Sequence, residues 1–193
     1  HAVIGGLQEL IERDALMITW LNRLPAKLIR TPERGCMAAS IIRHYARYGV
    51  LVQLLLLATD QAPKVVMAIA NNPDPRDAAR VIGMGCDVAP AVAVDKAVFE
   101  LCQARPSMAA RMRTANPSGR LTQYEDVRDL DDHPLFHAMP EHAAEFDFLF
   151  ASGAALSLDD LPVQPQRTPD QVLRHIVDGA VHTGIRTAYV DIT

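Results

Sequence analysis

Apolar residues recur every three to four positions in the opening segment of the chain, which predicts a helix over residues 2–22. The apolar stripe of this segment consists of Val3, Leu7, Leu10, Ile11, Met17, Ile18 and Leu21. The same spacing predicts four further helices, over residues 37–49, 91–112, 140–152 and 168–184. In the last of these, Thr168 is placed to cap the helix, Pro169 to occupy its first position and Gly184 to end it.

Two shorter runs rich in branched apolar residues, 50–59 and 64–72, are predicted to be strands, because the TDQAP sequence between them favours a turn. A last strand is predicted over 185–193. The segments predicted to be irregular are 22–32, the loop-like and then glycine-punctuated 71–90, and 116–140, a polar surface excursion or lid. The order of helices and strands predicts an α/β (or α+β) fold in one domain, with long helices packed on a mixed sheet.

The composition excludes several classes of protein. A net charge of −4 provides no basic surface of the kind that binds nucleic acid. The most apolar run, 50–58, is too short to cross a bilayer core of about 30 Å. Three cysteines without a Cys-x-x-Cys pair indicate neither a disulfide framework nor a zinc site, so we expect a reducing, cytoplasmic setting. Because the chain begins inside a helical pattern and ends in a predicted strand, we expect a fragment, incomplete at both ends.

Candidate chemistry is concentrated in two helical stretches of similar sequence, GLQELIER (6–13) and AVFELCQAR (97–105). Glu9 aligns with Glu100 and Glu12 with Gln103, which suggests a pseudo-duplicated fold. Residues three apart share a helix face, and neither face has the composition of a solvated stripe. Facing oxygen ligands of this kind suit Mg²⁺. The alternative is an ordinary Glu9–Arg13 ion pair of the i,i+4 type, and the spacing by itself leaves both interpretations open.

The sequence also resembles a known family, the YcaO domain. HAVIGGLQELIERDALMITWLNRLP (1–25) is similar to the family's A-x-x-x-A-L-x-E-x-I-E-R-D-A segment, which is followed by a tryptophan and a proline. GMGCDVAPAVAVDKAVFELCQAR (83–105) is similar to its later glycine-rich lead-in and A-x-x-E-x-x-Q-x-R helix. The likeness is specific in these two segments and loose elsewhere. Two positions depart from the pattern: Cys86–Asp87 stand near where many relatives have a histidine, and Lys96 stands where they have an arginine.

The resemblance implies an enzyme that uses ATP and Mg²⁺ to activate peptide backbone amides by O-phosphorylation, giving azolines or thioamides. It also implies a peptide or protein substrate, a leader-binding or sulfur-delivery partner, and a homodimer as one possible assembly. An accessory scaffold protein with the same fold is the alternative function. The implied Mg²⁺ ligands and nucleotide contacts are Glu9, Glu12, Glu100 and Gln103, and the implied phosphate-neutralising catalytic residues are Arg13 and Arg105.

Other chemistry-bearing residues are predicted to be structural. His133, His137 and His142 lie in a proline-broken segment and are interpreted as a solvated loop. Cys102 and Trp20 are predicted to belong to the core. The GMGC sequence (83–86) lacks the third glycine and the preceding predicted strand that a dinucleotide-binding fingerprint requires.

Overall fold

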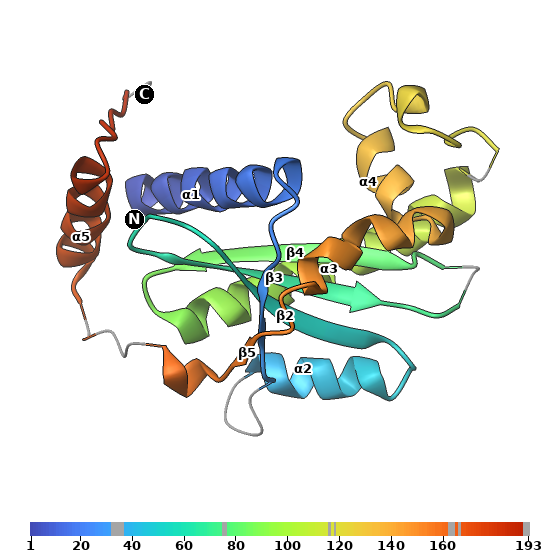
Figure 1. Ribbon diagram of the computed structural model, residues 1–193, viewed down its shortest axis with the longest axis horizontal. Coiled ribbons are helices and arrows are strands. Elements are labelled where there is room, and N and C mark those ends of the chain that lie inside the picture. The colour runs from blue at the N-terminus through green and yellow to red at the C-terminus, as the bar shows by residue number, and fades with distance from the viewer. Residues whose placement is uncertain are drawn as a thin grey trace.

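The computed structural model describes residues 1–31, 37–74, 77–115, 117, 119–161, 165 and 167–190. Its centre is a five-stranded mixed sheet with the strand order β4-β3-β2-β1-β5 (Figure 1). The strands are β1 (Lys27–Ile29), β2 (Leu51–Leu57), β3 (Lys64–Asn71), β4 (Arg80–Asp87) and β5 (Ala155–Leu156). Neighbouring strands are antiparallel except for β1 and β5, which are parallel. The predicted combination of helices with a mixed sheet is therefore confirmed.

In the described residues, five α-helices and three 3₁₀ helices surround this sheet. The α-helices are α1 (Ala2–Leu21), α2 (Met37–Ala46), α3 (Pro90–Ala115), α4 (Asp132–Ala138) and α5 (Pro169–His182). The 3₁₀ helices are η1 (Tyr124–Asp126), η2 (Pro140–Phe150) and η3 (Leu158–Asp160). None of the helices in the described part of the chain has both the length and the apolar content needed to span a membrane.

Helices cover both faces of the sheet, because the interior strand β3 has apolar side chains on both faces and these must be buried. Val65, Met67 and Ile69 point to the face that carries α1 and η2. The alternate residues of the strand point to the opposite face, where α2, α3 and α4 pack. Figure 1 shows α1 (blue) along one side of the sheet and α2 (light blue) on the other. A strand buried on both faces has a continuous apolar sequence, which is why β2 and β3 were predictable.

Strand β4 was not predicted, because two glycines interrupt its apolar pattern. Gly83 and Gly85 lie where α3 approaches the strand so closely that a Cβ atom on either residue would collide with the backbone of that helix. The GMGC sequence therefore serves helix–strand packing, and its glycines permit the close approach.

The other differences from the prediction lie in short or irregular elements. The stretch predicted as irregular over 22–32 contains β1, and β5 is likewise an addition. The predicted helix over 140–152 is the 3₁₀ helix η2. Of the predicted last strand, 185–190 has no regular structure and 191–193 lies outside the described residues. The excursion over 116–140 is anchored, because Leu121, Leu135 and Phe136 are buried in the core.

Helix α5 begins and ends as predicted. The Thr168 hydroxyl accepts a hydrogen bond from the Gln171 N–H, and Gly184 adopts a φ of 81° directly after the helix. The helix lies beside α1 (Figure 1), and its residues Ile176 and Ala180 are buried. The last turn is fixed to the β2–β3 loop by a hydrogen bond of 3.0 Å from Gln61 Nε2 to Thr183 Oγ1.

Candidate active site

The two sequence motifs meet at the outer edge of β4, where α1 and α3 approach from opposite faces of the sheet. Met84 presents its backbone N–H away from β3 and donates it to Glu100 Oε2 on α3, at 2.6 Å. Two residues further on, the Cys86 carbonyl accepts a hydrogen bond of 3.0 Å from Lys96 Nζ, also on α3. The side chains of α3 therefore line the strand edge toward α1.

Glu12 on α1 lies within electrostatic range of Glu100. Partial burial, followed by the neighbouring charges of Glu100 and Glu9, raises the pKa of the Glu12 carboxyl from 4.5 to about 7. Arg13 and Lys96 lower it only in part. The predicted convergence of the two motifs is thus present, and its centre is the pair Glu12–Glu100.

Glu9 and Arg13 are arranged differently. Arg13 Nη2 lies 2.8 Å from Glu9 Oε1, and the two side chains are 71% and 60% exposed. Solvent screens a surface pair of this i,i+4 kind, so it contributes little to stability. The ion-pair interpretation therefore describes this contact correctly.

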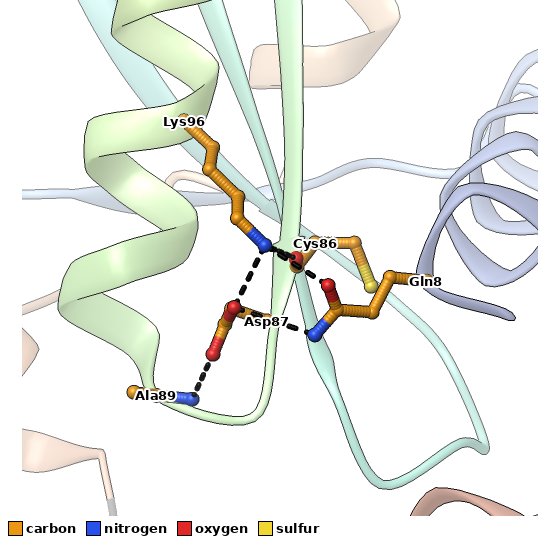
Figure 2. A network of polar contacts seen from close by, with 5 residues as sticks. All are labelled: Gln8, Cys86, Asp87, Ala89 and Lys96. Carbon is orange, nitrogen blue, oxygen red and sulfur yellow. Dashed lines mark hydrogen bonds and ion pairs between the residues drawn. The ribbon is translucent and has the colours of Figure 1, made fainter. Parts of the chain in front are cut away.

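A polar network fixes α1 to the end of β4 and the start of α3 (Figure 2). Lys96 Nζ donates to Asp87 Oδ2 at 2.7 Å and to Gln8 Oε1 at 3.0 Å, in addition to the Cys86 carbonyl. Gln8 Nε2 donates to Asp87 Oδ2 at 3.3 Å, and Asp87 Oδ1 accepts from the Ala89 N–H at 3.0 Å. An ammonium group has three donors, and all three are used here. Lysine thus fits the position at which the family pattern favours arginine.

Gln8 and Asp87 are site residues that the motif comparison missed. Gln8 precedes Glu12 by four residues and therefore shares its helix face, which the helical spacing alone indicates. Asp87 ends a strand that the sequence pattern did not predict, so no local signal places it beside α1.

The arrangement fits a divalent cation. The two nearest cationic side chains have other partners, because Arg13 is paired with Glu9 and Lys96 with Asp87. The neighbouring carboxylates of Glu12 and Glu100 therefore still repel each other, and a bound cation would relieve that repulsion. Within the described ranges, no group of three or more His, Cys, Asp or Glu side chains is placed to bind a metal ion. Mg²⁺ is often bound by one or two carboxylates together with phosphate oxygens and water, and such a site needs no third protein ligand.

The structure does not bring Arg105 to this pair. Arg105 follows Glu100 by five positions, a rotation of roughly 140° around the helix. Its Nη2 lies 3.0 Å from Asp77 Oδ2, and its guanidinium lies over the Tyr45 ring at 5.6 Å from the centroid. Gln103 is exposed and, three residues after Glu100, shares the face of that residue.

The interpretation of the three histidines as a solvated loop was wrong for His137 and His142, whereas His133 is exposed, although it lies on α4 and not in a loop. His137 is buried on α4, with its ring centroid 5.1 Å from that of Trp20, and burial lowers its pKa. The His142 ring stacks on Phe136 at 3.7 Å. These rings lie in the contact between α4, η2 and α1, which periodicity cannot reveal because the intervening prolines break the pattern.

The cysteines are placed as structural residues. Burial, aided by the charge of Glu12, raises the pKa of the Cys86 thiol to about 12, so that it stays protonated at neutral pH. Cys102 is partly buried and packs against the core, as predicted. Trp20 also packs as predicted, against Phe146. Cys36 lies outside the described residues.

Comparison with known proteins decides the family. Residues 1–193 match the family described as YcaO cyclodehydratase, ATP- and Mg²⁺-binding. The chain belongs to the YcaO family. A comparison with curated protein sequences gives no match.

Solved YcaO structures share the fold. The YcaO protein of Methanopyrus kandleri bound with AMPPCP and Mg²⁺ is 26% identical, with a TM-score of 0.68 over 95% of this chain. The heterocyclase TruD is 18% identical, with a TM-score of 0.61 over 95% of the chain. The Escherichia coli microcin synthetase McbBCD with bound pro-MccB17 is 16% identical, with a TM-score of 0.58 over 88%. The chain spans 44%, 23% and 42% of these three chains, less than half of each.

The Glu12–Glu100 pair predicts that the stability of the metal-free chain depends on pH. The pKa of Glu12 is 4.5 when unperturbed and about 7 when folded, so the folded state binds this proton more tightly. The contribution of Glu12 to the free energy of unfolding therefore falls as the pH rises from 4.5 to about 7, and stays low above that. Because the Glu12 carboxyl is only partly buried and solvent screens its interactions, this loss of stability is smaller than the difference between the folded and unfolded pKa values implies.

Urea denaturation of the wild type and of Glu12→Gln, with chelator present, measures this contribution. We expect Glu12→Gln to be the more stable protein at pH about 8 and to lose that advantage at pH about 4.5. An equal difference at both pH values would contradict the assignment.

Proposed function

We propose that the protein containing this chain activates peptide backbone amides with ATP and Mg²⁺. The observation that supports this is the Glu12–Glu100 pair, two neighbouring carboxylates at the edge of β4. The M. kandleri relative bound with AMPPCP and Mg²⁺ supports the same choice of ligands. When bound, ATP with Mg²⁺ supplies the phosphoryl group that turns an amide oxygen into a leaving group.

In this proposal the residues of the chain act mainly by binding and positioning. Glu12 and Glu100 bind the cation directly. Gln103, on the helix face of Glu100, and the exposed Glu9, which is paired with Arg13, are peripheral contacts in this proposal. Arg13 and Arg105 remain the proposed partners for phosphate charge. For Arg105 this role requires release from Asp77. Gln8, Asp87 and Lys96 fix α1 against α3 and thereby set the separation of the two carboxylates. Positioning and charge stabilisation of this kind provide most of the catalysis in phosphoryl transfer.

The nucleophile comes from outside this chain in our proposal. The Cys86 thiol is buried and protonated, and Cys102 packs against the core. A Cys, Ser or Thr side chain of the substrate would give an azoline, and a sulfide source would give a thioamide. A related heterocyclase in complex with substrate and cofactor, and the microcin synthetase complex with pro-MccB17, support a peptide substrate and a partner protein.

Calorimetry of the intact protein with a non-hydrolysable ATP analogue tests the proposal. We expect saturable binding that requires Mg²⁺ and disappears when a chelator is added. Absence of binding in the presence of Mg²⁺ would contradict the proposal and favour an accessory scaffold protein. Mass spectrometry of a modified substrate then separates the two reactions, because azoline formation removes water and thioamide formation replaces oxygen with sulfur.

A further inference from the structure

A pocket of about 580 Å³ opens between the same two helices, one helical turn from the carboxylate pair. Leu16 follows Glu12 by four residues on α1, and Ala104 follows Glu100 by four residues on α3, and both line the pocket. Four residues of an α-helix advance by about 6 Å, so the pocket begins one turn beyond the carboxylates on both helices. This volume is typical of a site for a small molecule or a large side chain.

Seven of the sixteen residues that line the pocket are aromatic or sulfur-containing. The Trp20 ring lies edge-on to His137 and to Phe146, with both centroid distances at 5.1 Å. Met17 and Met108 also line the pocket. Aromatic rings and thioethers interact favourably with a further ring, so the lining favours an aromatic occupant over a short aliphatic one.

The pocket also contains buried polar atoms that lack a hydrogen bond. His137 is only 8% exposed, and its Nε2 has no hydrogen-bond partner within the described residues. Its Nδ1 faces Glu145 Oε2 at 3.1 Å. Arg80 pairs with Asp147 through Nη2 at 2.8 Å, whereas its buried Nη1 has no partner among the same residues. Buried polar groups are normally paired, so a ligand with its own hydrogen-bonding group would complete this site.

The adjoining strand edge suits a peptide. Backbone groups point to alternate sides along an antiparallel strand, and Met84 N–H and Cys86 C=O both point away from β3. The N–H and C=O of Ile82, two residues before Met84, therefore point outward as well. Ile82 also lines the pocket. Glu100 and Lys96 already bond the outward groups of Met84 and Cys86, which leaves Ile82 as the outward residue for a peptide backbone. A peptide that pairs with Ile82 would place a backbone amide near the carboxylates and a neighbouring side chain at the pocket.

We propose that this pocket binds an aromatic side chain with a hydrogen-bonding group, such as tyrosine, in the substrate residue next to the activated amide. The proposal rests on the proposed function for the identity of its occupant. It assigns a specificity role to Trp20, His137 and Phe146, which contact the side chain and not the reacting amide. Substrates with alanine at that residue would bind more weakly without losing their reactive group.

Trp20 is the sole tryptophan of the chain, so its fluorescence reports occupancy of the pocket without any need for ATP. The probes are N-acetyl-tyrosinamide, N-acetyl-phenylalaninamide and N-acetyl-alaninamide, with excitation at the red edge of the tryptophan band. We expect a saturable change with the two aromatic amides and at least about tenfold weaker binding of the alanine amide. A response that does not saturate, or one that is equal for all three probes, would overturn the proposal.

Two matched variants locate the response. Ala104→Phe fills the pocket and should weaken binding of the tyrosine amide by at least about tenfold, and Ala104→Leu is a smaller obstruction that should weaken it less. Ala110→Phe places the same ring on an exposed position of the same helix and should leave binding unchanged. Circular dichroism verifies folding of each variant, and unchanged binding in both folded Ala104 variants would contradict the proposal. If the protein binds nucleotide but shows no fluorescence response to the amides, only the pocket proposal is refuted. If it shows the fluorescence response but binds no nucleotide, only the proposed function is refuted.

Discussion

Replacing Glu12 with glutamine is expected to lower the Mg²⁺-dependent ATP turnover of the intact protein by at least about a hundredfold, the scale of losing one preorganised electrostatic contact to a transition state. The substitution keeps the shape of the side chain and removes the charge that faces Glu100. In the metal-free chain it also removes a repulsion, so the fold should remain intact and slightly more stable at neutral pH. Steady-state turnover at saturating Mg²⁺, compared with circular dichroism, measures both effects.

Glu9→Gln is the matched control for this experiment. Glu9 is three residues away on the same helix, but its carboxylate is exposed and paired with Arg13. We expect turnover to fall by only about threefold or less, in keeping with the weak contribution of exposed ion pairs. Equal losses in the two variants would contradict the central position that we assign to the Glu12–Glu100 pair.

Replacing Gly85 with alanine is expected to lower the free energy of unfolding by about 3 kcal/mol or more. The added Cβ would collide with the backbone of α3 at Ala93 and Ala97, and rigid backbone cannot move aside as a flexible side chain can. Because α3 carries Glu100 and Lys96, any displacement of the helix would also disturb the site. Chemical denaturation measures the loss of stability.

Gly6→Ala provides the opposite expectation within the same chain. Gly6 lies in α1, and nothing lies within 4 Å of the position that its Cβ would take. An alanine there should stabilise the protein by about 0.4–1 kcal/mol, since it restricts the unfolded chain and suits a helix. If both variants lowered stability equally, close packing would not be the reason that Gly85 is glycine.

The elements that could be predicted were those whose pattern is set by their own sequence. Helices α1 and α5 have a regular apolar spacing, and α5 also has the cap at Thr168 and the stop at Gly184. Strand β4 could not be predicted, since Gly83 and Gly85 owe their presence to a helix that packs on them from later in the chain. Tertiary contact, which local sequence does not encode, overrode local preference there.

The candidate site was predictable to a similar degree. The similarity of the two helical motifs placed Glu12 and Glu100 in one hypothesis, and the fold brings these two together. The motif similarity did not reveal that Glu9 and Arg105 lie apart from this pair. In the structure Glu9 is paired with Arg13, and Arg105 is paired with Asp77. Helical spacing identifies the face that a residue shares, but not what lies opposite that face.

The side chains of α3 at the edge of β4 have a further consequence, for aggregation. β4 is the edge strand of the described sheet, and an open strand edge is a template for pairing with another chain. Glu100 occupies the Met84 N–H and Lys96 the Cys86 carbonyl, so these ladder groups are closed to such pairing. Removing both side chains would therefore promote self-association of the chain through this edge, in addition to any loss of ligand binding.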